Sequence, residues 1–234
     1  MKLCETAYGS VIGRVESAAQ AAGRPGQVRL LAVSKTKPAG AIRTLAAAGQ
    51  RAFGENYVQE ALAKQRDLAD LPLEWHMIGP LQSNKCPEVA RHFDWLQSLD
   101  RHRLVPLLAR HRPAARGPLQ VLVQVNIDDE ASKSGCAPAD AAALADAVAA
   151  HSGLRLRGLM AIPAPAPDPA RRRDAFRRMR ALFDALRTSH PHADTLSMGM
   201  SDDFELAIAE GATMVRVGTA LFGKRDPAAA DPQA

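Results

Sequence analysis

The sequence is poor in cysteine and has no long apolar run. Its three cysteines, Cys4, Cys86 and Cys136, are widely spaced and odd in number. They fit neither a disulfide framework nor a metal-binding pattern, so a reducing cytoplasm suits them best. No apolar run approaches the roughly 20 residues of a membrane span, and the N-terminus lacks the basic and apolar segments of a secretory signal. These absences predict a cytoplasmic protein without membrane-spanning segments.

Aromatic residues are also scarce, at 4% of the chain, although the net charge of +5 is that of a basic protein. The densest basic run, at 171–180, contains a single aromatic ring, Phe176, which the helical pattern assigns to the core. Charge runs are weak evidence for a ligand, and this one lacks the interleaved stacking residues of many nucleic-acid-binding surfaces. We interpret it as a solvated helix face and do not expect nucleic acid to be a partner.

A glycine-rich dinucleotide loop is missing after the early strands, which argues against a doubly wound open sheet, the alternative fold. Eight predicted strands alternate with helices, at 28–35, 51–55, 73–79, 94–99, 119–127, 154–162, 195–200 and 214–218. This alternation predicts a single TIM-like (β/α)8 barrel. We expect the barrel, with an extra N-terminal helix at 3–22, to occupy residues 1–225, and the Ala- and Pro-rich tail at 226–234 to be disordered.

The stretch Leu-Leu-Ala-Val-Ser-Lys-Thr-Lys-Pro at 30–38 reads as a buried strand that ends at Ser34 and Lys35. A helix is expected next, with Pro38 in its first turn. The carboxyl ends of parallel strands are where ligands bind, and a partly desolvated amine there can attack a carbonyl. Position alone favours the simpler interpretation, in which Lys35 is a surface residue that caps the strand.

The loops after the seventh and eighth strands, at 197–201 and 216–219, offer small residues, hydroxyls and backbone N–H groups. A helix at 202–210, capped by Asp202 and Glu205, would direct its positive end at the first loop. Barrels commonly bind phosphate at these two loops, although their glycines could also serve only as turn residues. Together with the lysine on the first strand, the loops favour a phosphate-binding site.

Arg216 interrupts the apolar strand Met-Val-Arg-Val at 214–217. A buried guanidinium costs several kcal/mol unless it is paired. It therefore predicts either an internal salt bridge or a ligand acceptor. A lysine that forms a Schiff base, a phosphate cup and an arginine facing a ring nitrogen are together the parts of a pyridoxal phosphate site.

Five motifs, at 30–38, 53–60, 75–85, 196–204 and 215–223, resemble those of the pyridoxal phosphate homeostasis protein family. They are Leu-Leu-Ala-Val-Ser-Lys-Thr-Lys-Pro, Phe-Gly-Glu-Asn-Tyr-Val-Gln-Glu, Trp-His-Met-Ile-Gly-Pro-Leu-Gln-Ser-Asn-Lys, Leu-Ser-Met-Gly-Met-Ser-Asp-Asp-Phe and Val-Arg-Val-Gly-Thr-Ala-Leu-Phe-Gly. The resemblance runs from about residue 28 to residue 225. It implies a single barrel similar to the N-terminal domain of alanine racemase. It also implies that this barrel binds pyridoxal 5′-phosphate and, like the rest of the homeostasis family, has no established catalytic activity.

The resemblance also implies the cofactor-binding residues Lys35, Asn56, Ser201, Arg216, Gly218 and Thr219. Lys35 would carry the Schiff base, Arg216 would face the pyridine nitrogen, Asn56 would approach the ring, and the other three would hold the phosphate. His76 and Ser83 belong to the same motifs, and for His76 a structural role within its strand is equally open. No catalytic residue and no metal site is expected.

Three functions remain open on the sequence. The first, which we expect, is a monomeric carrier that holds the cofactor and releases it to apoenzymes that depend on it. The second is a racemase-like enzyme acting on amino acids. That reading requires a second base, supplied with help from an additional C-terminal domain, whereas this sequence ends eleven residues after Gly223. The third is a barrel that binds RNA or protein and has kept an old site.

Overall fold

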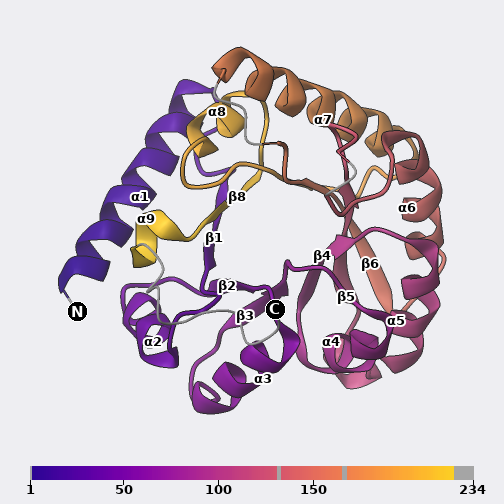
Figure 1. Ribbon diagram of the computed structural model, residues 1–234, viewed down its shortest axis with the longest axis horizontal. Helices are drawn as coiled ribbons and strands as arrows, with labels where there is room; N and C mark the ends of the chain where they lie inside the picture. Colours follow the sequence, from indigo (N-terminus) through magenta and orange to yellow (C-terminus); the bar gives the residue numbers. More distant parts are fainter. Residues whose placement is uncertain (1, 131–132, 165–167, 224–234) are drawn as a thin grey trace.

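The computed structural model describes residues 2–130, 133–164 and 168–223, and its strands form one closed parallel barrel (Figure 1). The strands are β1 (Arg29–Val33), β2 (Ala52–Glu55), β3 (Glu74–Met77), β4 (Trp95–Leu99), β5 (Leu119–Val125), β6 (Leu154–Ala161), β7 (Thr195–Ser197) and β8 (Met214–Val217). Each strand pairs with the next, and β8 pairs with β1. The predicted (β/α)8 barrel of the alanine racemase N-terminal type is confirmed. The tail at 226–234 lies outside the described residues.

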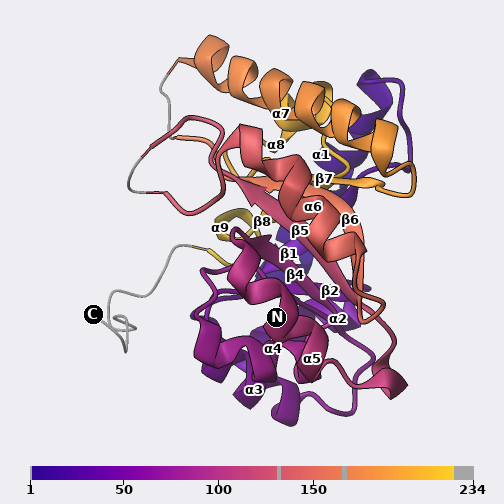
Figure 2. The same cartoon turned by 90° about the vertical axis from the view of Figure 1, so that its right-hand side faces the viewer.

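The helices form an outer layer around the barrel, and Figure 2 shows α6 and α7 along its outer face. They are α1 (Lys2–Ala21), α2 (Ala39–Ala47), α3 (Val58–Asp67), α4 (Cys86–His92), α5 (Val105–His111), α6 (Ala141–Ala149), α7 (Pro169–Ser189), α8 (Phe204–Ala209) and α9 (Thr219–Phe222). In α7, residues Phe176, Met179 and Phe183 recur at helical spacing and are buried in the main core. Burying each such side chain contributes about 1.5–3 kcal/mol.

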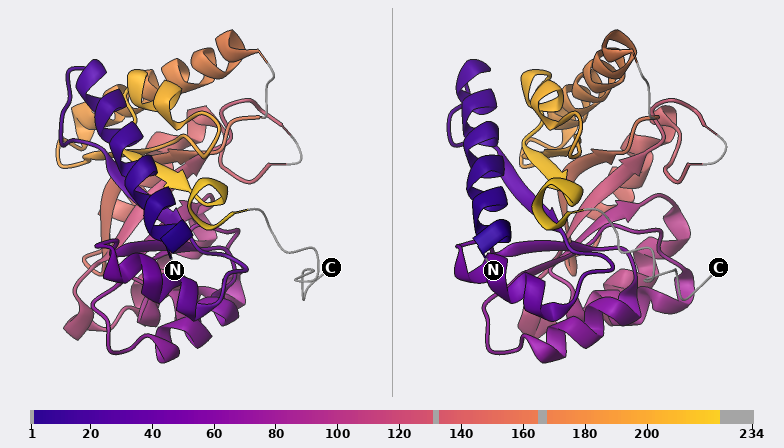
Figure 3. Two further views of the ribbon diagram at one scale, coloured as in Figure 1. Left: turned by 90° about the vertical axis from the view of Figure 1, so that its left-hand side faces the viewer. Right: turned by 60° about the vertical axis from the view of Figure 1, so that its left-hand side comes forward.

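The N-terminal helix compensates for the shortness of the last two helices. α8 has six residues and α9 has four, so neither can cover much of the barrel. Figures 1 and 3 show the 20-residue α1 on the outside of the barrel beside both of them. Its residues Val11, Val15 and Ala19 are buried, and Arg14 Nε donates to Glu205 Oε1 of α8 over 2.7 Å. α1 therefore covers the side of the barrel that the short helices α8 and α9 leave open.

Two predicted helix starts are wrong. Pro38 is the N-cap of α2, with extended backbone (φ −68°, ψ 156°), and α2 itself begins at Ala39. α8 begins at Phe204 with Asp203 as its N-cap, so the predicted capping box at Asp202 does not form. The carboxylate of Asp203 accepts a hydrogen bond from the N–H of Met200 over 2.7 Å. Asp203, and not Asp202, therefore joins the preceding loop to the start of α8.

No helix in the part of the chain described by the structure combines the length and the apolar character needed to cross a membrane. The basic run at 171–180 lies on α7, where several of its arginines face acidic neighbours. Arg177 Nε lies 3.1 Å from Glu210 Oε2, and Arg178 NH2 lies 2.7 Å from Asp128 Oδ1. This pairing agrees with the interpretation of the run as a solvated helix face.

We expect the thiols of Cys86 and Cys136 to be inert in the native protein. Both side chains are buried, and burial raises the pKa of each thiol to about 11. At about pH 8 roughly one molecule in a thousand would then carry the reactive thiolate. In a Cys4→Ser variant, the thiol reagent DTNB should react with both cysteines only after guanidinium is added. Rapid labelling of native Cys86 would contradict this and would show that its thiol is accessible and reactive.

Candidate functional site

A cavity of about 470 Å³ opens at the carboxyl ends of the strands. This volume is typical of pockets that bind small molecules. The structure brings all the predicted cofactor-binding residues to its lining: Lys35, Asn56, Ser201, Arg216, Gly218 and Thr219. His76 and Ser83 do not line the cavity; His76 lies in the barrel interior on β3, and Ser83 begins a short 3-10 helix outside it. The cavity is therefore the candidate site.

Lys35 reaches this cavity from a tight turn directly after β1. Ser34 N–H still donates to Gly54 O of β2 over 3.0 Å, and Lys37 N–H then donates back to Ser34 O over 3.1 Å. The neighbouring amine, Lys37 Nζ, donates to Phe222 O of α9 over 3.2 Å and is not part of the cavity lining. The turn thus separates the two lysines and sends Lys35 toward the cavity.

Among the charged residues that line the cavity, Arg216 is the buried one and forms its floor. Its side chain is 3% exposed, and its guanidinium donates to Ser197 Oγ and to Ala161 O, each over 2.7 Å. These partners are a hydroxyl and a carbonyl, so the pairing is not the carboxylate salt bridge that the sequence left open. Burial lowers the pKa of Arg216 to about 10, which still leaves it charged at neutral pH. A buried cation with neutral partners is suited to an electron-rich ligand atom.

A row of hydrogen bonds continues from Ser197 through the barrel interior. Ser197 Oγ donates to Gln97 Oε1 (2.7 Å), Gln97 Nε2 lies 2.9 Å from His76 Nδ1, and His76 Nε2 lies 2.7 Å from Glu74 Oε1. Because Gln97 Nε2 can only donate, the His76 proton is assigned to Nε2. Burial lowers the pKa of His76, which agrees with a neutral ring. In this structure His76 is a support of the cavity floor, not a contact of the cavity.

The loops after β7 and β8 lie side by side at one end of the cavity. Gly218 N–H points to Ser201 Oγ over 3.4 Å, and Arg216 N–H donates to Gly199 O over 3.0 Å. Gly199 has φ +94°, and a Cβ there would lie 2.5 Å from Ala207 Cβ, so the loop requires glycine. The loops offer hydroxyls and backbone N–H groups, as phosphate binding needs.

Glycine also allows Asn56 to reach the cavity. A Cβ on Gly79 would lie 2.2 Å from Asn56 O, so the backbones after β2 and β3 can approach only if residue 79 has no side chain. The backbone of Asn56 thereby lies against the residues that follow β3, and Asn56 is among the residues that line the cavity. Substituting Gly79 would displace one of these loops rather than leave a local clash.

Sequence reasoning missed the contribution of β5 and the loop after it. Gln124 and Lys133 both line the cavity, and Gln124 Nε2 donates to Ser134 O over 2.9 Å, which holds the loop in place. A signal was present, because Gln124 interrupts an apolar strand just as Arg216 does. Lys133 adds a second amine to the cavity, so position alone does not single out Lys35.

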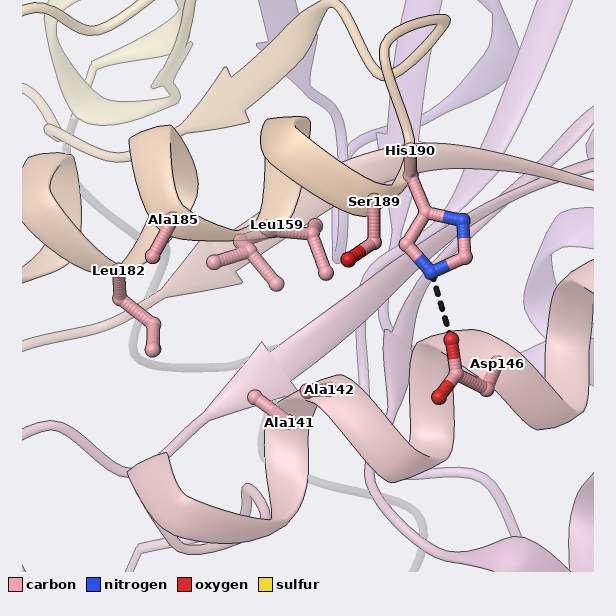
Figure 4. A pocket seen from close by; sticks show the side chains of 9 residues that line it. Ala141, Ala142, Asp146, Leu159, Leu182, Ala185, Ser189 and His190 are labelled. Carbon is pink, nitrogen blue, oxygen red and sulfur yellow. Dashed lines mark hydrogen bonds and ion pairs between the residues drawn. The ribbon is translucent and has the colours of Figure 1, made fainter.

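A second, smaller hollow of about 140 Å³ lies between α6 and α7 on the outside of the barrel (Figure 4). Its lining is mostly alanine and leucine, with Leu159 at its base. Two of the polar groups at its rim are paired with each other, since His190 Nε2 lies 2.8 Å from Asp146 Oδ1. It lacks the converging polar groups of the larger cavity and is a packing defect between helices.

Comparison with known proteins agrees with this geometry. The family model described as "Alanine racemase, N-terminal domain" matches residues 10–226. The chain is 60% identical over 217 residues to the pyridoxal phosphate homeostasis protein of Pseudomonas aeruginosa, covering 92% of this chain and 93% of that protein. It is 56% identical over 217 residues to the protein of the same name from Escherichia coli, with coverage of 91% and 93%. Among solved structures, PipY of Synechococcus elongatus with PLP bound is similar at a TM-score of 0.77 and 41% identity, covering 90% of this chain and 99% of that one.

We expect Ser197→Ala to destabilise the ligand-free protein by about 1–3 kcal/mol, because Arg216 then loses an acceptor and Gln97 loses a donor in a buried site. The matched control is Thr188→Ala, which removes an exposed hydroxyl that donates to Ala185 O on α7. Denaturant unfolding of both variants measures the difference. Equal effects of about 0.5 kcal/mol or less would show that the row of hydrogen bonds contributes nothing to stability.

Proposed function

Because the chain belongs to the pyridoxal phosphate homeostasis protein family, we propose that it binds pyridoxal 5′-phosphate through Lys35 and releases it to apoenzymes that depend on this cofactor. The observation that carries the proposal is the convergence of residues from five separate family motifs. Lys35, Asn56 and Gly79 from the first half of the chain meet Ser201, Arg216, Gly218 and Thr219 from the second half in one cavity. That convergence is a property of this chain's own structure.

The residues present fit the chemical groups of pyridoxal phosphate. The molecule supplies an aldehyde that condenses reversibly with a primary amine, and Lys35 offers one. The loops of Ser201, Gly218 and Thr219 would hold the phosphate, and Asn56 would lie against the ring. Arg216, buried and bonded to neutral partners, would donate to the pyridine nitrogen. Each part of the molecule thus has a counterpart of suitable chemistry.

Arg216 is also the reason to propose a carrier instead of an enzyme. A guanidinium that stays charged at neutral pH donates its hydrogen bond without giving up the proton, so the pyridine nitrogen facing it stays unprotonated. An unprotonated ring is a poor electron sink, and reactions at the α-carbon of a bound amino acid are correspondingly slow. The relatives from Pseudomonas aeruginosa and Escherichia coli are named as homeostasis proteins, which supports the same reading.

The proposal includes a monomer acting in the cytoplasm. Among the described residues, the exposed large apolar side chains are Tyr57 (37%) and Met200 (39%), and Met200 lines the cavity. An obligate oligomer would need a larger apolar patch than these two offer. The burial of both Cys86 and Cys136 as free thiols suits a reducing compartment.

Reduction of the loaded protein with borohydride should attach the pyridoxyl mass to Lys35, and Lys35→Ala should abolish it. Peptide mapping measures the site, and Lys133→Ala serves as the matched control, since it removes the other amine of the cavity. Label on Lys37, Lys85 or Lys133 in the wild-type chain would contradict the assignment.

Pyridoxal without its phosphate should bind on the order of tenfold more weakly or worse, as expected for one lost hydrogen bond to a charged group.

Mixing the loaded protein with an apoenzyme should restore that enzyme's activity, whereas mixing it with L-alanine should give no racemisation. Enzyme assay and chiral chromatography measure the two outcomes, and the Lys35→Ala variant is the control for free cofactor. Racemisation at about 1 per second or faster would instead show a racemase-like enzyme, since that rate is ordinary for catalysis.

A further inference from the structure

A buried ionic cluster lies behind the turn that carries Lys35. It consists of Lys64 on α3, Glu55 at the end of β2 and Glu60 in the first turn of α3. The side chains of Lys64 and Glu55 are 7% and 0% exposed, and that of Glu60 is 26% exposed. None of the three is among the residues that line the cavity, so the function proposed above leaves this cluster without a role.

The ammonium group of Lys64 has a partner for each of its three donors. Nζ lies 2.7 Å from Glu55 Oε1, 2.7 Å from Glu60 Oε1 and 2.7 Å from Ser34 O. A lysine held in this way is a fixed cation rather than a nucleophile. Burial raises the pKa of the Glu55 carboxyl, while the charge of Lys64 and the hydrogen bonds from Lys64 and Ser34 act to lower it.

The cluster holds both peptide groups that flank Lys35. Ser34 O, which accepts from Lys64, belongs to the peptide group before Lys35. The N–H of Thr36, which donates to Glu60 Oε1 over 2.6 Å, belongs to the peptide group after it. Because peptide groups are planar, fixing both of them fixes the backbone dihedral angles of Lys35 and the direction in which its Cα–Cβ bond leaves the backbone.

The turn needs such support because its backbone is unfavourable. Thr36 has φ +61°, in the left-handed region, which costs roughly 1–3 kcal/mol for a residue other than glycine and is rare for a β-branched one. On the other side of Lys35, Ser34 Oγ donates to Glu55 Oε1 over 2.6 Å. The cluster therefore contacts the residues before and after Lys35, while Lys35 itself lines the cavity.

We propose that Lys64 and Glu60, together with Glu55, are positioning residues that hold the amine of Lys35 where the aldehyde of bound pyridoxal phosphate meets it. The inference rests on the proposed function. In the condensation that this arrangement would serve, the neutral amine of Lys35 would join the aldehyde carbon in a C=N bond, and the C=O bond would break as the oxygen leaves with both amine hydrogens as water. Without the cluster, the ligand still binds by its phosphate and ring, but condensation is slow because the amine is misplaced.

The test separates binding from condensation with two ligands. Pyridoxine 5′-phosphate has the same ring and phosphate but no aldehyde, so its affinity reports the cavity alone. In Lys64→Met and Glu60→Ala, we expect this affinity to stay within about twofold, while the rate of imine formation with pyridoxal phosphate falls on the order of 10- to 100-fold. Arg43→Met is the matched control, because it breaks an exposed ion pair to Asp70 close to the same helices.

Two further measurements distinguish positioning from packing. Thr36→Gly removes the cost of the left-handed backbone. Adding it to Lys64→Met should therefore recover part of the lost rate, at least about threefold. If Lys64→Met acted only through a packing defect, Thr36→Gly would not recover the rate. In the ligand-free protein, the amide of Thr36 should exchange with solvent at least about tenfold faster in Glu60→Ala than in the wild type, since its acceptor is gone.

A wild-type rate of condensation in a folded Lys64→Met protein would overturn the proposal. An equal loss of affinity for both ligands, or no recovery on adding Thr36→Gly, would assign the cluster to stability alone and overturn it as well. Should Lys64→Met fail to fold, Glu60→Ala decides, because Glu60 is partly exposed. Failure of the proposed function is recognised separately: the wild type would then form no imine at Lys35, whereas the amide exchange, which needs no ligand, would still report whether the cluster holds the turn.

Discussion

The site depends on the pairing of β8 with β1 that closes the barrel. This register places Leu31 beside Arg216 and Ala32 beside Val217. The strand that leads into Lys35 and the strand that leads into Gly218 therefore end next to each other, although they come from opposite ends of the sequence. A Cβ on Gly218 would lie 3.3 Å from Val33 O, which shows how closely the two backbones approach. An open sheet of the same strands would leave the amine and the phosphate loops at different edges.

Polar side chains replace part of the apolar packing in the barrel interior, where they support the charged guanidinium of Arg216. Its apolar residues fall into two small clusters, one around Leu31 and Met214 and one around Trp95 and Leu122. Between them runs the row of polar side chains that ends at Arg216. A desolvated guanidinium is tolerated there because its neighbours are themselves satisfied, and the order of donors and acceptors along the row leaves one consistent arrangement of protons. Rigidity at the cavity floor follows from that arrangement.

The features predicted from the sequence are those encoded locally. Apolar runs predict all eight strands, and the polar residues within or just after those runs point to Lys35 and Arg216. The prediction of a capping box at Asp202 was wrong because two neighbouring aspartates can each cap the helix. The hydrogen bond from Met200 N–H to the carboxylate of Asp203 favours Asp203. Local pattern gives no information about that competition.

Lys64 could not be predicted to be buried, because its burial depends on distant partners. It lies on the same face of α3 as Val58 and Ala61, where an apolar residue would be expected. What makes a lysine acceptable there is a carboxylate from β2 and a carbonyl that follows β1, and both positions exist only once the barrel has formed. The Gly79 requirement has the same origin, since only the folded chain brings Asn56 against it.

The position of α1 has a consequence for how the protein is made. Among the helices that pack on α1, α2 follows it closely in the sequence, whereas α8 and α9 are synthesised much later. During synthesis α1, with its buried residues Val11, Val15 and Ala19, thus lacks part of its native cover until α8 and α9 have been made. Apolar surface left partly uncovered during synthesis is prone to aggregate, and it is the kind of surface that chaperones shield.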